Sequence, residues 1–194
     1  PAWATEGVTL PPFSRQDVLL LLGVLGSAVL ALLFGAYLRR WTLRQPPGPP
    51  AMQEVARAIQ TGAYAYLRRQ FKTMIWFILA IFLGLYLLYQ PIYQDLRLSL
   101  GVAVAFLMGV LASYGAGVVG MDMAVKGNVR TAAKAMTTYK GALETAFRAG
   151  AVSGMFTVGL GLLGATLIFL VYRERAMYVL VGFGFGGSLA ALFM

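Results

Sequence analysis

The residues that most resemble a chemical motif in this sequence are glycines. Two groups of three have the spacing Gly-x-Gly-x-x-Gly: Gly115, Gly117 and Gly120, and Gly159, Gly161 and Gly164. In nucleotide-binding proteins this spacing forms a tight turn between a strand and a helix, where free backbone N–H groups bind phosphate. Both groups here lie inside long apolar stretches, where a membrane helix already uses its N–H groups. We therefore interpret them as contacts between packed helices.

Pairs of glycines four residues apart also indicate closely packed helices. This Gly-x-x-x-Gly spacing lets two membrane helices approach each other, because neither position has a side chain. The candidates for helix packing from both patterns are Gly115, Gly117, Gly120, Gly150, Gly154, Gly182 and Gly186.

Other groups that could do chemistry are few and scattered. The 194 residues contain no Cys and no His, which excludes disulfides, thiolate or imidazole metal ligands and the nucleophile pairs that need either residue. The seven Asp and Glu residues are spread singly along the chain. A site for several metal ions needs converging carboxylates. We therefore predict no catalytic, cofactor-binding or metal-binding residue in these 194 residues.

The elements that would position these residues are apolar helices. Hydrophobic residues make up 59% of the chain and charged residues 12%, about half the charged fraction of a soluble domain. Five stretches without a charged side chain have the length that a helix needs to cross a bilayer: 18–38, 73–94, 98–121, 149–172 and 176–194. The sequence predicts an all-α, polytopic membrane helix bundle with five transmembrane helices. The fifth is expected to be truncated, because the sequence stops inside its apolar stretch.

Charge in the connecting segments predicts the orientation of this bundle. Residues 39–72 contain seven basic side chains and one acid, and residues 122–148 contain five basic and two acidic side chains. Basic connectors stay on the cytoplasmic side of a membrane. We therefore expect both connectors inside, and the N-terminal tail of residues 1–17 outside. The same rule accounts for the net charge of +9, so no nucleic acid partner is expected.

The connector 39–72 is expected to contain a helix. Four prolines between residues 46 and 50 break the chain. After them, apolar residues recur at helical spacing from Met52 to Tyr66. This pattern predicts an amphipathic helix that runs directly into the second span.

The connector 122–148 is expected to contain a break followed by a helix. Gly127 and Asn128 interrupt the chain, and Asn128 would cap a helix from Val129 onward. Arg130 and Arg148 are the candidates in this connector for a role at the cytoplasmic surface, and Arg148 is expected to face water or lipid headgroups.

Four stretches resemble the membrane-bound, ion-pumping pyrophosphatases. They are 59–73 before the second span, 117–133 after the third, 146–154 at the start of the fourth and 182–193 in the fifth. Their order is that of the family. Thr61 departs from the family pattern, because an acid is expected before the glycine at this point.

This resemblance implies that the full-length protein hydrolyses pyrophosphate with Mg²⁺ on the cytoplasmic side and moves H⁺ or Na⁺ outward as a homodimer. It implies an integral protein of a prokaryotic plasma membrane, with the lipid bilayer and the remaining helices of the same pump as partners. The first four helices would belong to an outer scaffold. The family's pyrophosphate-binding and Mg²⁺-binding motifs would begin beyond Met194, so this portion alone is expected to be inactive and to bind no cofactor.

Two other classes of protein remain open. One is a stand-alone multi-pass assembly subunit, and the other is a small transporter. None of the five spans contains an ionisable Asp, Glu, Lys or Arg, and ion pathways through membranes usually need such groups. An independent transporter would therefore need a polar pathway formed by oligomerisation.

Overall fold

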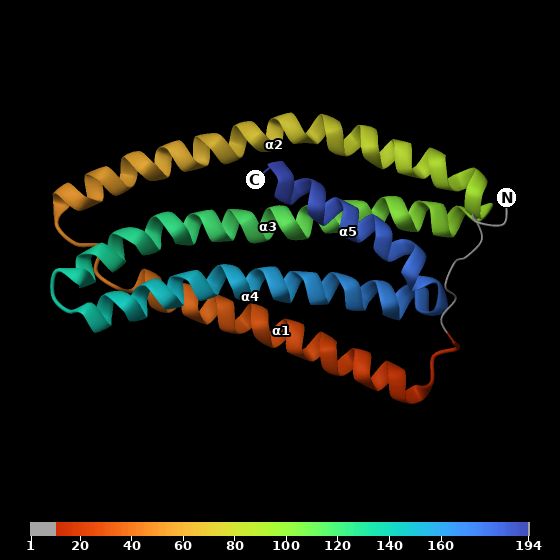
Figure 1. Cartoon of the computed structure of the whole chain (residues 1–194), viewed down its shortest axis with the longest axis horizontal. Helices are drawn as coiled ribbons and strands as arrows, with labels where there is room; N and C mark the ends of the chain where they lie inside the picture. Colours follow the sequence, from red (N-terminus) through yellow and green to blue (C-terminus); the bar gives the residue numbers. More distant parts are fainter. Residues whose placement is uncertain (1–10, 194) are drawn as a thin grey trace.

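A computed structural model describes residues 11–193, and these form a bundle of long helices without a strand (Figure 1). Residues 1–10 of the predicted tail and residue 194 of the predicted fifth span lie outside the described residues. The helical elements in chain order are α1 (Arg15–Leu43), α2 (Pro50–Tyr93), α3 (Leu96–Ala135), α4 (Tyr139–Tyr172), the 3-10 turn η2 (Arg173–Arg175) and α5 (Ala176–Phe193). The all-α fold that the sequence predicts is confirmed.

Four helical stretches of the described residues are long and apolar enough to cross a membrane. Three are α1, α2 and α3, and the fourth is Tyr139–Phe193, which contains α4, η2 and α5 in continuity. The criterion of length and hydropathy therefore finds four stretches where the sequence predicts five spans. Many large apolar side chains are exposed, among them Leu20, Trp76 and Leu111. Exposure on this scale is typical of a surface that faces lipid.

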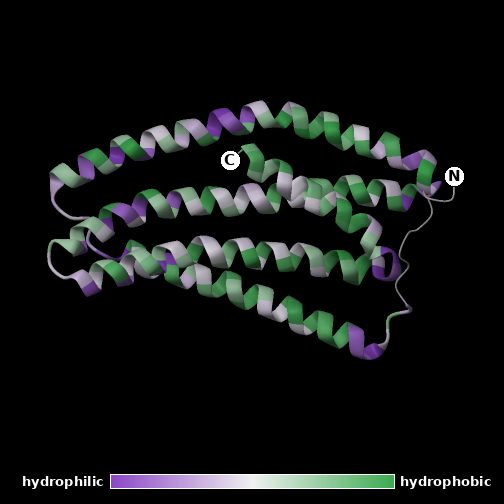
Figure 2. Cartoon of the chain, in the orientation of Figure 1, coloured by the Kyte–Doolittle hydropathy of each residue, from purple (hydrophilic) through white to green (hydrophobic). Residues whose placement is uncertain are grey.

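The helices are longer than a bilayer is thick. α2 has 44 residues and α3 has 40, which corresponds to roughly 60 Å or more at about 1.5 Å per residue, against about 30 Å for a hydrocarbon core. Figure 2 shows that α2 is more hydrophobic toward its C-terminal end, whereas hydrophilic residues concentrate toward the loops 44–49 and 136–138. The half of the bundle that contains the C-terminal end of α2 is therefore the more hydrophobic half, as expected for contact with lipid. The half near the two loops is the more hydrophilic, as expected for contact with water.

α3 lies at the centre of the bundle and packs against α2, α4 and α5, while α1 packs mainly against α4. The side chains of Val102 and Phe106 on α3 are fully buried, and Val110 is 3% exposed. α5 turns back from η2 along α3 (Figure 1). These contacts make α3 the central helix of the bundle.

The predicted break at Gly127 and Asn128 is wrong, because α3 continues through both residues to Ala135. Gly127 faces α4, and a Cβ atom there would lie 2.7 Å from the Cβ of Ala149. Glycine at this position therefore allows two helices to pack closely. The chain turns instead at residues 136–138, where the side chain of Thr138 caps α4 by accepting a hydrogen bond from the N–H of Gly141.

Candidate functional site

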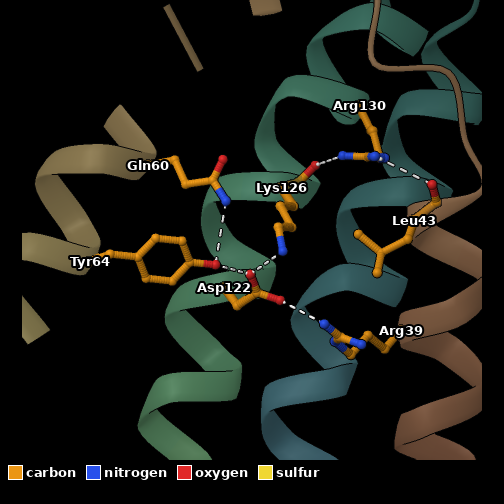
Figure 3. Close-up of polar contacts among 7 residues, drawn as sticks. All are labelled: Arg39, Leu43, Gln60, Tyr64, Asp122, Lys126 and Arg130. Carbon is orange, nitrogen blue, oxygen red and sulfur yellow. Dashed lines mark hydrogen bonds and ion pairs between the residues drawn. The ribbon is translucent and has the colours of Figure 1, made fainter. Parts of the chain in front are cut away.

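A buried carboxylate joins three helices at the point where the apolar stretch of α3 ends (Figure 3). Asp122 accepts a hydrogen bond from Arg39 Nη2 of α1 at 3.0 Å and another from the hydroxyl of Tyr64 on α2. Its Oδ1 atom lies 2.5 Å from Nζ of Lys126, one turn further along α3. We refer to these four residues as the Asp122 junction. Since α1 and α2 do not pack on each other within residues 11–193, the junction links them through α3.

The Asp122 junction holds its carboxylate in the ionised form. Burial alone would raise the pKa of Asp122, but hydrogen bonds from Lys126, Tyr64 and Arg39 together lower it below its ordinary value. The hydrogen bond to Asp122 in turn raises the pKa of Lys126. Asp122 and Lys126 are therefore both charged at neutral pH. A carboxylate that accepts hydrogen bonds from three donors is held in its charged form, which fits a structural role in linking helices better than a role in proton transfer.

Arg130 lies two turns beyond Asp122 on α3 and binds backbone carbonyls. Its Nη1 donates to the carbonyl of Lys126 at 2.8 Å, its Nε to Gln45 at 3.1 Å and its Nη2 to Leu43 at 3.3 Å. The last carbonyls of a helix have no partner within the helix. Arg130 therefore fixes the end of α1 and the following loop to α3.

Arg148 lies near the start of α4 and packs on an aromatic ring of α1. Its guanidinium carbon is 3.9 Å from the centroid of the Trp41 ring, and its Nη2 lies 2.6 Å from Oε1 of Glu144. A cation over an indole ring is attracted by the electron-rich face. The side chain is 34% exposed, so only part of it faces outward, and it ties α4 to α1.

Two of the seven packing glycines lie in the tightest contact of the bundle, between α3 and α5. A Cβ atom on Gly182 would overlap the carbonyl oxygen of Val102, and one on Gly186 would overlap the carbonyl oxygen of Phe106. The reciprocal position on α3 is Gly109, where a Cβ atom would overlap the carbonyl oxygen of Phe183. Gly109 is not among the seven glycines predicted to pack, although it lies in the apolar stretch 98–121.

The other five glycines have different surroundings. A Cβ on Gly120 would lie 2.8 Å from Oγ of Ser153 on α4, whereas one on Gly115 would lie 3.9 Å from the nearest side chain. Gly117 lines a groove of about 400 Å³ between α3, α4 and α5. A Cβ on Gly150 or Gly154 would meet no atom within 4 Å.

Asp122, Tyr64 and Arg39 are also not among the site residues predicted from the sequence. One signal was present, because Asp122 is the first charged residue after 98–121 and Lys126 follows at the spacing of one helical turn. The contributions of α1 and α2 depend on tertiary packing and have no local pattern. Among residues 11–193, no three His, Cys, Asp or Glu side chains lie close enough together to hold a metal ion.

Comparison with known proteins agrees with the resemblance. The family described as Inorganic H+ pyrophosphatase matches residues 29–194. A protein of Chloroflexus aurantiacus named K(+)-insensitive pyrophosphate-energized proton pump is 46% identical over 187 residues, which cover 88% of this chain and 24% of that protein. A pump of the same name from Streptomyces avermitilis is 41% identical over 194 residues, covering 93% of this chain and 24% of that protein.

A relative with the same name from the archaeon Methanosarcina mazei is 36% identical over 167 residues, covering 86% of this chain. The chain spans about a quarter of the length of these relatives. The matched residues include the Asp122 junction, Arg130, Arg148 and the α3–α5 contact. The chain therefore belongs to the inorganic H+ pyrophosphatase family.

Proposed function

We propose that this chain is the N-terminal scaffold of a membrane pump that couples pyrophosphate hydrolysis to outward H⁺ transport. The Asp122 junction carries this proposal, because it ties α1, α2 and α3 into one unit and commits its carboxylate to three donors. The pyrophosphate and Mg²⁺ sites would then be formed by the remaining helices of the same pump. The named relatives are proton pumps insensitive to K⁺, which favours H⁺ over Na⁺ here.

The scaffold proposal is tested in the intact pump with Asp122→Ala and a matched control, Glu144→Gln. Glu144 also forms an ion pair on one face of a helix, but its side chain is 46% exposed. We expect Asp122→Ala to lower the yield of assembled pump, while pyrophosphate hydrolysis and H⁺ uptake per assembled molecule stay at the wild-type ratio. Normal assembly with loss of hydrolysis would contradict a scaffold role, because it would place Asp122 in the reaction.

We also propose five transmembrane segments, with the N-terminus outside and the connectors 39–72 and 122–148 in the cytoplasm of a prokaryote. The excess of basic residues in both connectors supports this orientation. The turn at η2 supports two segments within Tyr139–Phe193, because α5 runs back from it along α3 (Figure 1). The lipid bilayer and a second pump subunit are the expected partners.

Single cysteines test the orientation, since the 194 residues contain none. Gln94→Cys and Thr137→Cys place an exposed thiol at turns on opposite ends of the bundle. In intact cells of a pump without other cysteines, a membrane-impermeant maleimide should label Gln94→Cys and leave Thr137→Cys unlabelled until the cells are opened. Labelling of Thr137→Cys from outside would reverse the proposed orientation.

The alternative is a stand-alone assembly subunit or small transporter. The groove between α3, α4 and α5 is lined by small residues, including Ser113, Gly117 and Ser153, and would suit a helix of a separate partner. Expression of residues 1–194 alone separates these possibilities. Stable co-purification with another membrane protein, or ion flux in vesicles, would favour the alternative over a portion of a pump.

A further inference from the structure

We propose that the cavity between the end of α1, the beginning of α2 and the end of α3 binds an anion that carries a phosphate group. This cavity has a volume of about 430 Å³. Five of the residues that line it have long polar or basic side chains: Gln53, Arg57, Gln60, Lys126 and Arg130. We call it the Arg57 cavity. Three of its lining residues, Gln60, Lys126 and Arg130, are drawn in Figure 3.

The cations of the Arg57 cavity retain unused hydrogen-bond donors. A guanidinium has five N–H groups, and Arg130 uses three nitrogens for single bonds to carbonyl oxygens. The ammonium of Lys126 has three N–H groups and pairs with one carboxylate, that of Asp122. Among residues 11–193, no ion pair or side-chain hydrogen bond involves the guanidinium of Arg57. The cavity therefore offers several free N–H groups from three cations.

The charge balance around the Arg57 cavity favours an anion. Arg57, Lys126 and Arg130 line it, and the carboxylate next to it, Asp122, is already bound by Arg39 and Lys126. Glu54 on α2 does not line the cavity. A phosphate group presents several oxygens in different directions and can bridge cations from two helices. Arginine forms two parallel hydrogen bonds with phosphate particularly well.

The position of the cavity along α3, just beyond the apolar stretch, allows two sources for this phosphate: a phospholipid headgroup and free phosphate in solution. The apolar stretch 98–121 ends directly before Asp122, so Lys126 lies roughly 7–8 Å and Arg130 roughly 13–14 Å beyond the end of this stretch, at about 1.5 Å per residue. The headgroup layer on each side of a bilayer is about 5–8 Å thick. A phospholipid headgroup reaches Lys126 from the membrane, and free phosphate reaches Arg57 from the solution.

The experiment compares wild-type pump with Arg57→Gln and with a matched control, Lys140→Gln. Both substitutions remove one exposed positive charge, but Lys140 lies at the start of α4 and outside the cavity lining. The purified pump is titrated with inorganic phosphate against chloride at constant ionic strength, and separately with phosphatidylglycerol against phosphatidylcholine in mixed micelles. The rise in the thermal unfolding midpoint reports binding, since a ligand of the native state stabilises it.

We expect wild type and Lys140→Gln to respond alike, and Arg57→Gln to need about tenfold more ligand for the same shift, because one charge-assisted contact is lost. Arg57→Lys, which keeps the charge, should restore part of the response. Phosphate bound at the hydrolytic site contributes equally to all variants, so only the difference between them is used.

Each outcome of the two titrations decides the proposal. A dependence on Arg57 in the phosphate titration alone identifies free phosphate as the source, and one in the phosphatidylglycerol titration alone identifies a lipid headgroup. The proposal is overturned if Arg57→Gln responds like wild type in both titrations. It is equally overturned if Lys140→Gln loses as much response as Arg57→Gln, because general surface charge would then explain the effect.

Discussion

Asp122 on α3 and Arg39 on α1 form an ion pair at 3.0 Å although they are 83 residues apart in the chain. The Asp122 side chain is 10% exposed, and that of Arg39 is 42% exposed. α1 packs mainly on α4, so this pair supplies a direct polar link from α1 to α3. The hydroxyl of Tyr64 extends the link to α2.

Replacement of Asp122 should therefore destabilise the bundle. Asp122→Asn keeps the size of the side chain but removes the charge that pairs with Arg39 and Lys126. We expect a loss of about 1–3 kcal/mol in the free energy of unfolding, because a side chain that is 10% exposed loses its charge-assisted hydrogen bonds. Glu144→Gln should cost less than about 1 kcal/mol, because the Glu144 side chain is 46% exposed and water weakens its pair with Arg148. Thermal unfolding of both variants in one detergent measures the difference, and equal costs would contradict a structural role.

The Asp122 junction also predicts a specific acid sensitivity. The pKa of Asp122 is lower in the folded protein than in the unfolded chain, so its contribution to stability is complete above the unfolded value of about 3.9 and is lost as pH falls through the folded value. The pKa of Lys126 is raised, so its contribution is complete below about 10.4 and is lost as pH rises through the folded value.

The measurement is the unfolding midpoint of wild type and Asp122→Asn from acid to alkaline pH. The difference between the two proteins should be constant from about pH 5 to pH 9 and should shrink below about pH 4. A difference that changes near neutral pH would show that another group, with a pKa in that range, controls the junction.

The all-α fold is predictable from the sequence, because the length of the apolar stretches and their lack of charge are local properties. Prediction from the sequence fails at Gly127 and Asn128, where residues that often end a helix lie inside α3. Gly127 packs against Ala149 of α4, and this close contact explains why a glycine occupies the position. Tertiary contact outweighs local propensity at such positions, and a single sequence carries no record of that contact.

The candidate site is predictable only in part for the same reason. The Lys126–Asp122 pair has a local spacing, whereas Arg39 and Tyr64 reach Asp122 from helices far away in the chain. The glycine patterns indicate helix packing but not which face is used. Gly182 and Gly186 lie in close contact with α3, while Gly150 and Gly154 have the same spacing and face open space.

This difference between glycines predicts opposite effects of the same substitution on α5. Gly186→Ala places a Cβ atom against the backbone of Phe106, which cannot move without shifting α3. We expect a loss of about 1–3 kcal/mol or failure to fold, as for other overpacked contacts. Gly184→Ala meets no atom within 4 Å, so it should be neutral or should stabilise the helix by up to about 1 kcal/mol. Folded yield and unfolding midpoint measure both, and a tolerated Gly186→Ala would contradict the close α3–α5 contact.

The last prediction concerns Arg130, whose guanidinium binds the carbonyls of Leu43 and Gln45 as well as that of Lys126. Arg130→Lys keeps the charge but replaces a planar fork of donors with a single ammonium group. The ammonium donates from one nitrogen atom, so it cannot take the place of Nε, Nη1 and Nη2, each of which binds a different carbonyl. The end of α1 should therefore open more often in this variant, and hydrogen exchange should become faster in residues 41–45.

A matched control for this experiment is Arg40→Lys, because Arg40 is exposed near the end of the same helix. Hydrogen exchange followed by mass spectrometry should show faster exchange at the end of α1 in Arg130→Lys and wild-type rates in Arg40→Lys. If Arg130→Lys left exchange at residues 41–45 unchanged, its contacts with Leu43 and Gln45 would not hold the loop. The protection of residues 41–45 from exchange would then come from the helix end itself, where the N–H of Arg44 donates to the carbonyls of Arg40 and Trp41.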